Sequence, residues 1–142
     1  IFHGNKIKMT LKNLINILLH WISLNTDYDT SKFDFPVKIV DQKKIQEIAC
    51  GGKCPVIAFF SEKEGILISS NNLESLCNQS ILLHEIIHSF QVDLNIQNAF
   101  KEKEAYELQN KFLEEFSIKN DMIKILNVKK CRSNQLRDLF VE

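Results

Sequence analysis

The sequence predicts an α+β fold in which helices pack on a small sheet. Apolar residues recur every three to four positions in several long segments, a spacing typical of amphipathic helices. Two short apolar runs are separated by a polar segment that ends in glycine, which favours a β-hairpin. A chain of 142 residues can bury a hydrophobic core but is too short for two domains of ordinary size. We therefore expect residues 1–142 to form a single domain.

The N-terminal part predicts a long helix, a short strand and a brief helix. Thr10 precedes the first apolar-periodic segment and is a suitable N-cap, and Asp41 is a suitable N-cap for the brief helix. Gly51 and Gly52 interrupt the pattern and end that helix near Cys50. The expected elements are, in order, a helix over 9–24, a loop over 25–34, a strand over 36–40 and a helix over about 41–50.

The remainder predicts a hairpin followed by helices. The apolar runs that form the hairpin cover 55–60 and 66–68, and the polar segment 61–65 connects them. Helical spacing then returns in three segments, with an interruption near 131–134 in the last. These expected helices cover about 73–92, 99–118 and 121–140.

Composition excludes several classes of protein. Eighteen basic residues balance eighteen acidic residues, so the chain lacks the net positive charge that favours nucleic acid or an anionic membrane. The content of 44% hydrophobic and 25% charged residues is typical of globular proteins rather than disordered chains. No apolar run approaches the roughly 20 residues that a membrane-spanning helix needs.

The cysteines indicate an exported protein. Four cysteines in a short chain permit two disulfides in three possible pairings: they are Cys50, Cys54, Cys77 and Cys131. Cys50 and Cys54 could close a small loop or join separate partners, and a CxxxC zinc knuckle is the alternative. Together with a first residue, Ile1, that is not Met, the count leads us to expect a periplasmic or secreted protein with at least one disulfide.

The segment His84-Glu85-Ile86-Ile87-His88 matches the pattern HExxH. On a helix, residues i and i+4 lie on one face, so both imidazoles can bind one metal ion. Glu85 lies about 100° around the helix and could reach a water on that ion rather than the ion itself. Zinc lowers the pKa of its bound water, and a nearby carboxylate can accept the proton as that water attacks a carbonyl carbon. His84 and His88 are therefore candidate zinc ligands and Glu85 is the candidate general base.

A catalytic zinc site usually has three protein ligands, so a third is needed. The next expected helix contains three glutamates near its start: Glu102, Glu104 and Glu107. If Ala105, Leu108, Phe112 and Phe116 define its buried face, Glu104 lies at the edge of that face, one turn before Leu108. Glu102 lies on the other flank and is the weaker candidate, and Glu107 points away. We therefore expect Glu104 to be the third ligand.

The motif His84-Glu85-x-x-His88 followed by a helical Glu resembles that of gluzincins, a group of zinc metallopeptidases. The blocks ILLHEIIHSFQ and EKEAYELQ are also similar to those of small, largely uncharacterised bacterial proteins of metallopeptidase type, in which a cysteine-containing segment and a hairpin precede the zinc helix. The resemblance covers about residues 50–113. It implies a zincin-like fold, zinc at His84, His88 and Glu104, and Glu85 as general base. The N-E-x-x-x-D block of the larger gluzincins does not occur in this sequence.

Other residues have more than one interpretation each. Gln91 lies one heptad after His84 and could contact substrate, hydrogen-bond a ligand or lie at the rim. Cys77 lies a heptad before His84, and a disulfide or a buried thiol is favoured there over zinc ligation. The strand over 65–69 could be an edge strand that pairs with an extended peptide, or an interior strand. Tyr106 is a candidate to stabilise an oxyanion, but an ideal helix directs it away from Glu104, and Tyr28 and His20 are equally open candidates.

The leading hypothesis is a zinc-dependent peptidase that hydrolyses peptide or protein substrates with a zinc-bound water activated by Glu85. The first alternative is a non-catalytic zinc-binding or interaction module on the same scaffold. The second is a zinc amidohydrolase that acts on a non-peptide amide, such as a cell-wall bond.

Overall fold

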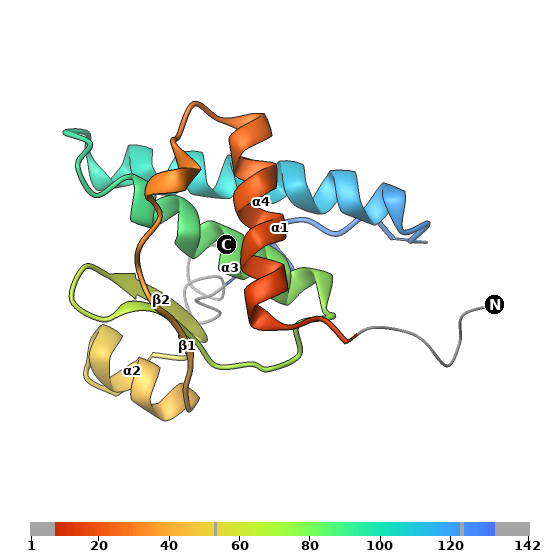
Figure 1. The fold of residues 1–142 in the computed structure, drawn as a ribbon. Helices are drawn as coiled ribbons and strands as arrows, with labels where there is room; N and C mark the ends of the chain where they lie inside the picture. Colours follow the sequence, from red (N-terminus) through yellow and green to blue (C-terminus); the bar gives the residue numbers. More distant parts are fainter. Residues whose placement is uncertain (1–7, 53, 123, 133–142) are drawn as a thin grey trace.

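The computed structural model describes residues 8–52, 54–122 and 124–132. These form an α+β domain, as the sequence predicts, in which helices lie on both faces of a small sheet (Figure 1). In chain order the elements are α1 (Leu11–Asn25), the 3-10 helix η2 (Thr30–Lys32), β1 (Val37–Ile39), α2 (Gln42–Cys50), β2 (Ala58–Ser61), β3 (Gly65–Ile68), α3 (Leu76–Phe90) and α4 (Asn98–Lys119).

The sheet has the strand order β1-β3-β2, with β1 parallel to β3 and β2 antiparallel to it. The expected hairpin is confirmed, with Phe59 opposite Leu67 in its register. Strand β3 is the central strand and is buried along its whole length, which explains its continuous apolar sequence. The strand over 65–69 is therefore interior rather than an edge, and β2 is an edge strand of the described sheet.

The alternation of β3 divides the core into two parts. Ile66 and Ile68 face the main core, which α1, α3 and α4 complete, whereas Leu67 faces a smaller cluster beneath α2. Helix α3 contacts both β2 and β3, and α4 lies along the side of α3 (Figure 1). Because α3 lies between the sheet and α4, ten of its residues are buried, including polar ones. This burial brings the HExxH motif into the interior of the domain.

Helix α1 begins as the sequence predicts, with the Thr10 side chain accepting a hydrogen bond of 3.1 Å from the Asn13 amide. It crosses α4 (Figure 1), where the Trp21 ring packs edge-on against Phe112 at 5.5 Å. The Trp21 indole nitrogen also donates a hydrogen bond of 3.2 Å to Glu115. None of the helices in the described part of the chain has both the length and the apolar character that crossing a membrane requires.

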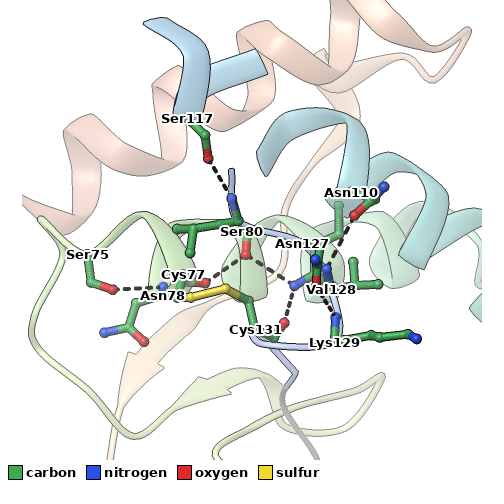
Figure 2. The surroundings of a disulfide bond; sticks show 12 residues. Ser75, Cys77, Asn78, Ser80, Asn110, Ser117, Asn127, Val128, Lys129 and Cys131 are labelled. Atoms are coloured by element: carbon green, nitrogen blue, oxygen red, sulfur yellow. Dashed lines mark hydrogen bonds between the residues drawn. A yellow bond between two sulfur atoms is a disulfide. The ribbon is translucent and has the colours of Figure 1, made fainter. Parts of the chain in front are cut away.

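The helix expected over 121–140 is wrong for the described part of that range. Asp121 has a positive φ of 53°, which ends α4, and residues 124–132 form bends and turns. The Ser117 hydroxyl and the Asn110 amide oxygen of α4 accept hydrogen bonds from the amides of Leu126 and Val128, so these amides do not make helical bonds (Figure 2). The remainder of that expected helix, from 133 onward, lies outside the described residues.

Both disulfides that four cysteines permit are formed. Cys50 pairs with Cys54 to close a small loop, and Cys77 of α3 pairs with Cys131. The Cys77–Cys131 bond therefore ties the irregular segment that follows α4 to the start of α3 (Figure 2). Cys77 is not available as a metal ligand, and the zinc knuckle at Cys50 and Cys54 is excluded.

The two disulfides should differ in their contribution to stability. Cys77–Cys131 joins residues 54 apart and Cys50–Cys54 joins residues 4 apart. Because a longer loop loses more chain entropy, we expect the double replacement of Cys77 and Cys131 by Ser to lower the free energy of unfolding by about 4 kcal/mol, against about 2 kcal/mol for Cys50 and Cys54. Urea denaturation of the two variants tests this, and equal losses would contradict it.

Candidate metal centre

The HExxH motif lies in the C-terminal half of α3, and its two imidazoles point toward the first turns of α4. The Nε2 atoms of His84 and His88 are 3.1 Å apart. The Oε1 atom of Glu102 lies 2.9 Å from the first and 2.8 Å from the second. The three residues form a group whose ligand atoms all lie within 4.8 Å of one another.

Two buried glutamines determine which nitrogen of each imidazole carries its proton. The Oε1 atom of Gln109 lies 2.9 Å from His84 Nδ1, and that of Gln91 lies 2.7 Å from His88 Nδ1. Each glutamine directs its amide nitrogen at backbone carbonyl oxygens, that of Cys131 for Gln109 and that of Lys101 for Gln91. Since a carbonyl oxygen can only accept, both amide orientations are determined, and both Nδ1 atoms must carry a proton.

The donor set suits a divalent cation. When both imidazoles are neutral with the proton on Nδ1, two Nε2 lone pairs and a carboxylate oxygen meet at one point with no proton between them. A tetrahedral zinc ion holds its ligand atoms roughly 3.3 Å apart, because each lies about 2.0–2.1 Å from the metal. The separations of 2.8 to 3.1 Å are close to that value. His84, His88 and Glu102 therefore could hold a metal ion.

The electrostatics of the group also favour positive charge. Burial lowers the pKa of His88, but the hydrogen bond to Glu102 and the charges of Glu85 and Glu102 outweigh burial and raise that pKa to about 8. Burial raises the pKa of Glu102, but its hydrogen bonds to His84 and His88 outweigh burial and hold that pKa well below its ordinary value. A proton and a metal ion thus compete for the Nε2 lone pair of His88.

This competition predicts a pH dependence of metal binding. Because the His88 pKa is about 8, a metal ion that binds below this pH must displace a proton from Nε2. We expect the apparent zinc affinity of the folded protein to rise about tenfold per pH unit toward pH 8 and to level off above it. Competition with a chromogenic chelator between pH 6 and pH 9 measures this, and an affinity that is constant over that range would contradict it.

The group opens into a pocket of about 360 Å³. Glu85, which is 5% exposed, also lines this pocket, as do residues of the edge strand β2 and the ring of Tyr106. The full lining consists of Ala49, Cys50, Cys54, Val56, Ala58, Phe59, Phe60, His84, Glu85, His88, Glu102 and Tyr106. The candidate base and the candidate ligands thus share one cavity, which has an apolar wall along β2.

The structure differs from the sequence-based expectation at the third ligand. Glu104 does not join the histidines, and its carboxylate instead accepts hydrogen bonds from the Tyr28 hydroxyl and the Gln91 amide nitrogen. The carboxylate grouped with the histidines is that of Glu102. The difference arises from the helix face, because the buried residues of α4 include Gln109 whereas Leu108 is only half-buried. Glu102 lies two turns before Gln109 on that face. Assigning Gln109 to the buried face is therefore what would have indicated Glu102 from the sequence.

The structure also decides the interpretation of two other residues. Tyr106 lies one turn after Glu102, and its ring centroid is 4.4 Å from that of His84, so this residue does face the centre. Gln91 hydrogen-bonds a candidate ligand, which selects one of its three open interpretations. His20 lies on α1, is exposed and does not line the pocket. His3 lies outside the described residues.

Comparison with known families places the chain. The sequence profile described as "Domain of unknown function (DUF6647)" matches residues 8–139, which is nearly the whole chain. The chain belongs to the DUF6647 family. Every element that builds the candidate metal centre lies inside the DUF6647 match, so the centre is part of this domain. Neither the search of curated proteins nor the search of solved structures found a significant match.

Proposed function

We propose that the protein is a zinc-dependent peptidase with His84, His88 and Glu102 as metal ligands. The observation that carries the proposal is the convergence of two Nε2 atoms and one carboxylate oxygen at a cavity that Glu85 also lines. Two imidazoles and one carboxylate form the ligand set typical of catalytic zinc sites, whereas structural zinc sites usually have four protein ligands rich in cysteine. A zinc ion bound there supplies Lewis-acid polarisation and a water of lowered pKa.

Glu85 is the general base in this proposal. It is buried, lies next to His84 in the sequence and lines the same pocket as His84, His88 and Glu102, and its charge raises the pKa of His88. Glu85 takes a proton from the attacking water as that oxygen bonds to the carbonyl carbon. It then returns the proton to the amine nitrogen as the carbon–nitrogen bond breaks.

The position of β2 supports a peptide substrate. This strand lies at an edge of the described sheet, and Ala58, Phe59 and Phe60 line the pocket that contains the cluster. An extended peptide can bind such an edge through main-chain hydrogen bonds, which would bring one of its carbonyl groups beside the ligands. The apolar wall at Phe59 and Phe60 favours substrates with an apolar side chain near the cleaved bond.

We also propose that the protein works in the periplasm or outside the cell. The structure contains two disulfides. Disulfides persist in an oxidising compartment and are rare in proteins of a reducing cytosol. A peptidase there would act on exported proteins or peptides.

Metal analysis and hydrolysis assays test the proposal together. We expect about one zinc ion per chain in protein purified without a metal-affinity step, and we expect hydrolysis of casein that stops on chelation and returns with zinc. Zinc binding without hydrolysis of any substrate would favour the non-catalytic module. Hydrolysis of peptidoglycan fragments but not of casein would favour the amidohydrolase, and absence of zinc even after refilling would refute all three.

A further inference from the structure

Gln91 connects the metal centre to a second set of polar groups behind it. This residue is the C-cap of α3 and is 1% exposed. Its Oε1 atom faces His88 Nδ1 at 2.7 Å. Its amide nitrogen donates two hydrogen bonds of 2.9 Å, one to the Lys101 carbonyl and one to the Glu104 carboxylate. All the hydrogen-bonding groups of this amide are therefore used.

The direction of this amide decides whether His88 can bind a metal ion. If the amide were reversed, its NH2 group would face Nδ1 and would require that nitrogen to accept. The proton of a neutral imidazole would then lie on Nε2, the atom that faces Glu102 and His84. A protonated Nε2 has no lone pair for a metal ion. A reversal of Gln91 would thus block one ligand.

Glu104 opposes this reversal. In the reversed state the Gln91 oxygen would lie against the Glu104 carboxylate and the Lys101 carbonyl, so that three acceptors would face one another. Hydrogen bonds to a carboxylate are roughly twice as strong as those between neutral groups. The negative charge of Glu104 therefore makes the larger contribution to the observed orientation.

Tyr28 holds Glu104 in turn. Its hydroxyl donates to the same Glu104 oxygen that accepts from Gln91, and its ring stacks on Phe90 at 5.4 Å, with 14° between the planes. Tyr28 lies in the segment that follows α1, whereas Phe90 is the last residue of α3. The N-terminal segment, α3 and α4 therefore meet at the Glu104 carboxylate.

We propose that Glu104 is a positioning residue, held by Tyr28, which orients Gln91 so that His88 keeps its metal-binding tautomer. This inference rests on the metal centre of the proposed function. It assigns to Glu104 an effect on zinc affinity that is transmitted through Gln91, with no direct contact to the ion or the substrate. In this arrangement the carboxylate of Glu102 binds the metal and that of Glu104 orients a ligand.

Zinc affinity compared between two matched variants tests the assignment. Glu104→Ala removes the acceptor that joins Tyr28 to α4, and Glu115→Ala removes the acceptor that joins Trp21 to the same helix, away from the centre. We expect Glu104→Ala to weaken zinc binding about 10- to 100-fold in a chelator competition, with Glu115→Ala within twofold of wild type. We expect Glu104→Gln, which keeps an acceptor oxygen, to recover part of the affinity.

The tautomer of His88 gives an independent readout that needs no metal or activity. Nitrogen-15 NMR of the metal-free protein, recorded at a pH at which the imidazole signals are those of the neutral form, distinguishes a proton on Nδ1 from one on Nε2. We expect the Nδ1 form in the wild type and a substantial Nε2 population in Glu104→Ala. If Glu104→Ala does not fold, Tyr28→Phe, which retains the stacking on Phe90, should show the same change at smaller amplitude.

The results separate this inference from the proposed function. Unchanged affinity and an unchanged tautomer in a folded Glu104→Ala would overturn the positioning role, and so would equal losses of affinity in Glu104→Ala and Glu115→Ala. Wild-type protein that binds no zinc would refute the metal centre, and the tautomer measurement would still decide the role of Glu104. Zinc binding without hydrolysis would refute the peptidase and leave the positioning role supported or overturned by the same two measurements.

Discussion

Replacing Glu85 by Gln should lower the turnover of a peptide substrate by about 10²- to 10⁴-fold, the usual effect of losing a general base. The amide has nearly the shape of the carboxylate but cannot accept the proton of the attacking water. Because Glu85 is not among the three grouped ligands, we expect the zinc content to stay at the wild-type level. Steady-state kinetics and metal analysis of the same preparation measure both quantities.

Glu85→Asp provides the control for this substitution. It keeps the carboxylate but shortens the side chain by one methylene, so we expect activity between those of the wild type and Glu85→Gln. Full hydrolysis by a zinc-loaded Glu85→Gln would contradict the role of Glu85 as base. Loss of zinc from Glu85→Gln would instead show that Glu85 supports the ligands, whose charge state it influences.

Replacing Glu102 by Ala should produce the largest loss of metal affinity among substitutions in α4. A structural zinc ion contributes about 10–16 kcal/mol through four ligands, or roughly 3–4 kcal/mol for each. Loss of one ligand should therefore weaken zinc binding on the order of 10²- to 10³-fold. The removal also leaves His84 and His88 without the carboxylate that lies within 2.9 Å of both Nε2 atoms.

Two further glutamates of α4 provide comparison variants for Glu102→Ala. Glu107 is exposed and lies 3.9 Å from Lys103, so Glu107→Ala should leave zinc affinity unchanged. Glu104→Ala should give the intermediate loss expected of a residue that acts through Gln91. The expected order of zinc affinity is thus wild type and Glu107→Ala, then Glu104→Ala, then Glu102→Ala. A greater loss in Glu104→Ala than in Glu102→Ala would return the ligand role to Glu104.

Local patterns predicted most of the secondary structure. The apolar spacing of 9–24, the cap at Thr10 and the hairpin around 61–65 depend on neighbours in sequence, and each is present. The pattern over 121–140 was misleading for the described residues of that range, 121–122 and 124–132, because tertiary contacts override helical periodicity there. Hydrogen bonds to Asn110 and Ser117 and the bond to Cys77 hold residues 126–131 in an irregular path.

The sequence alone determined that His84 and His88 share one helix face, because a helix places residues i and i+4 on one face whatever surrounds it. Only the tertiary structure decided which glutamate completes the group. The rotation of α4 about its axis depends on the burial of Gln109 and on a contact between Glu104 and Tyr28, 76 residues away in sequence. Apolar periodicity identifies the apolar part of a buried face, so it does not detect a face whose centre is polar.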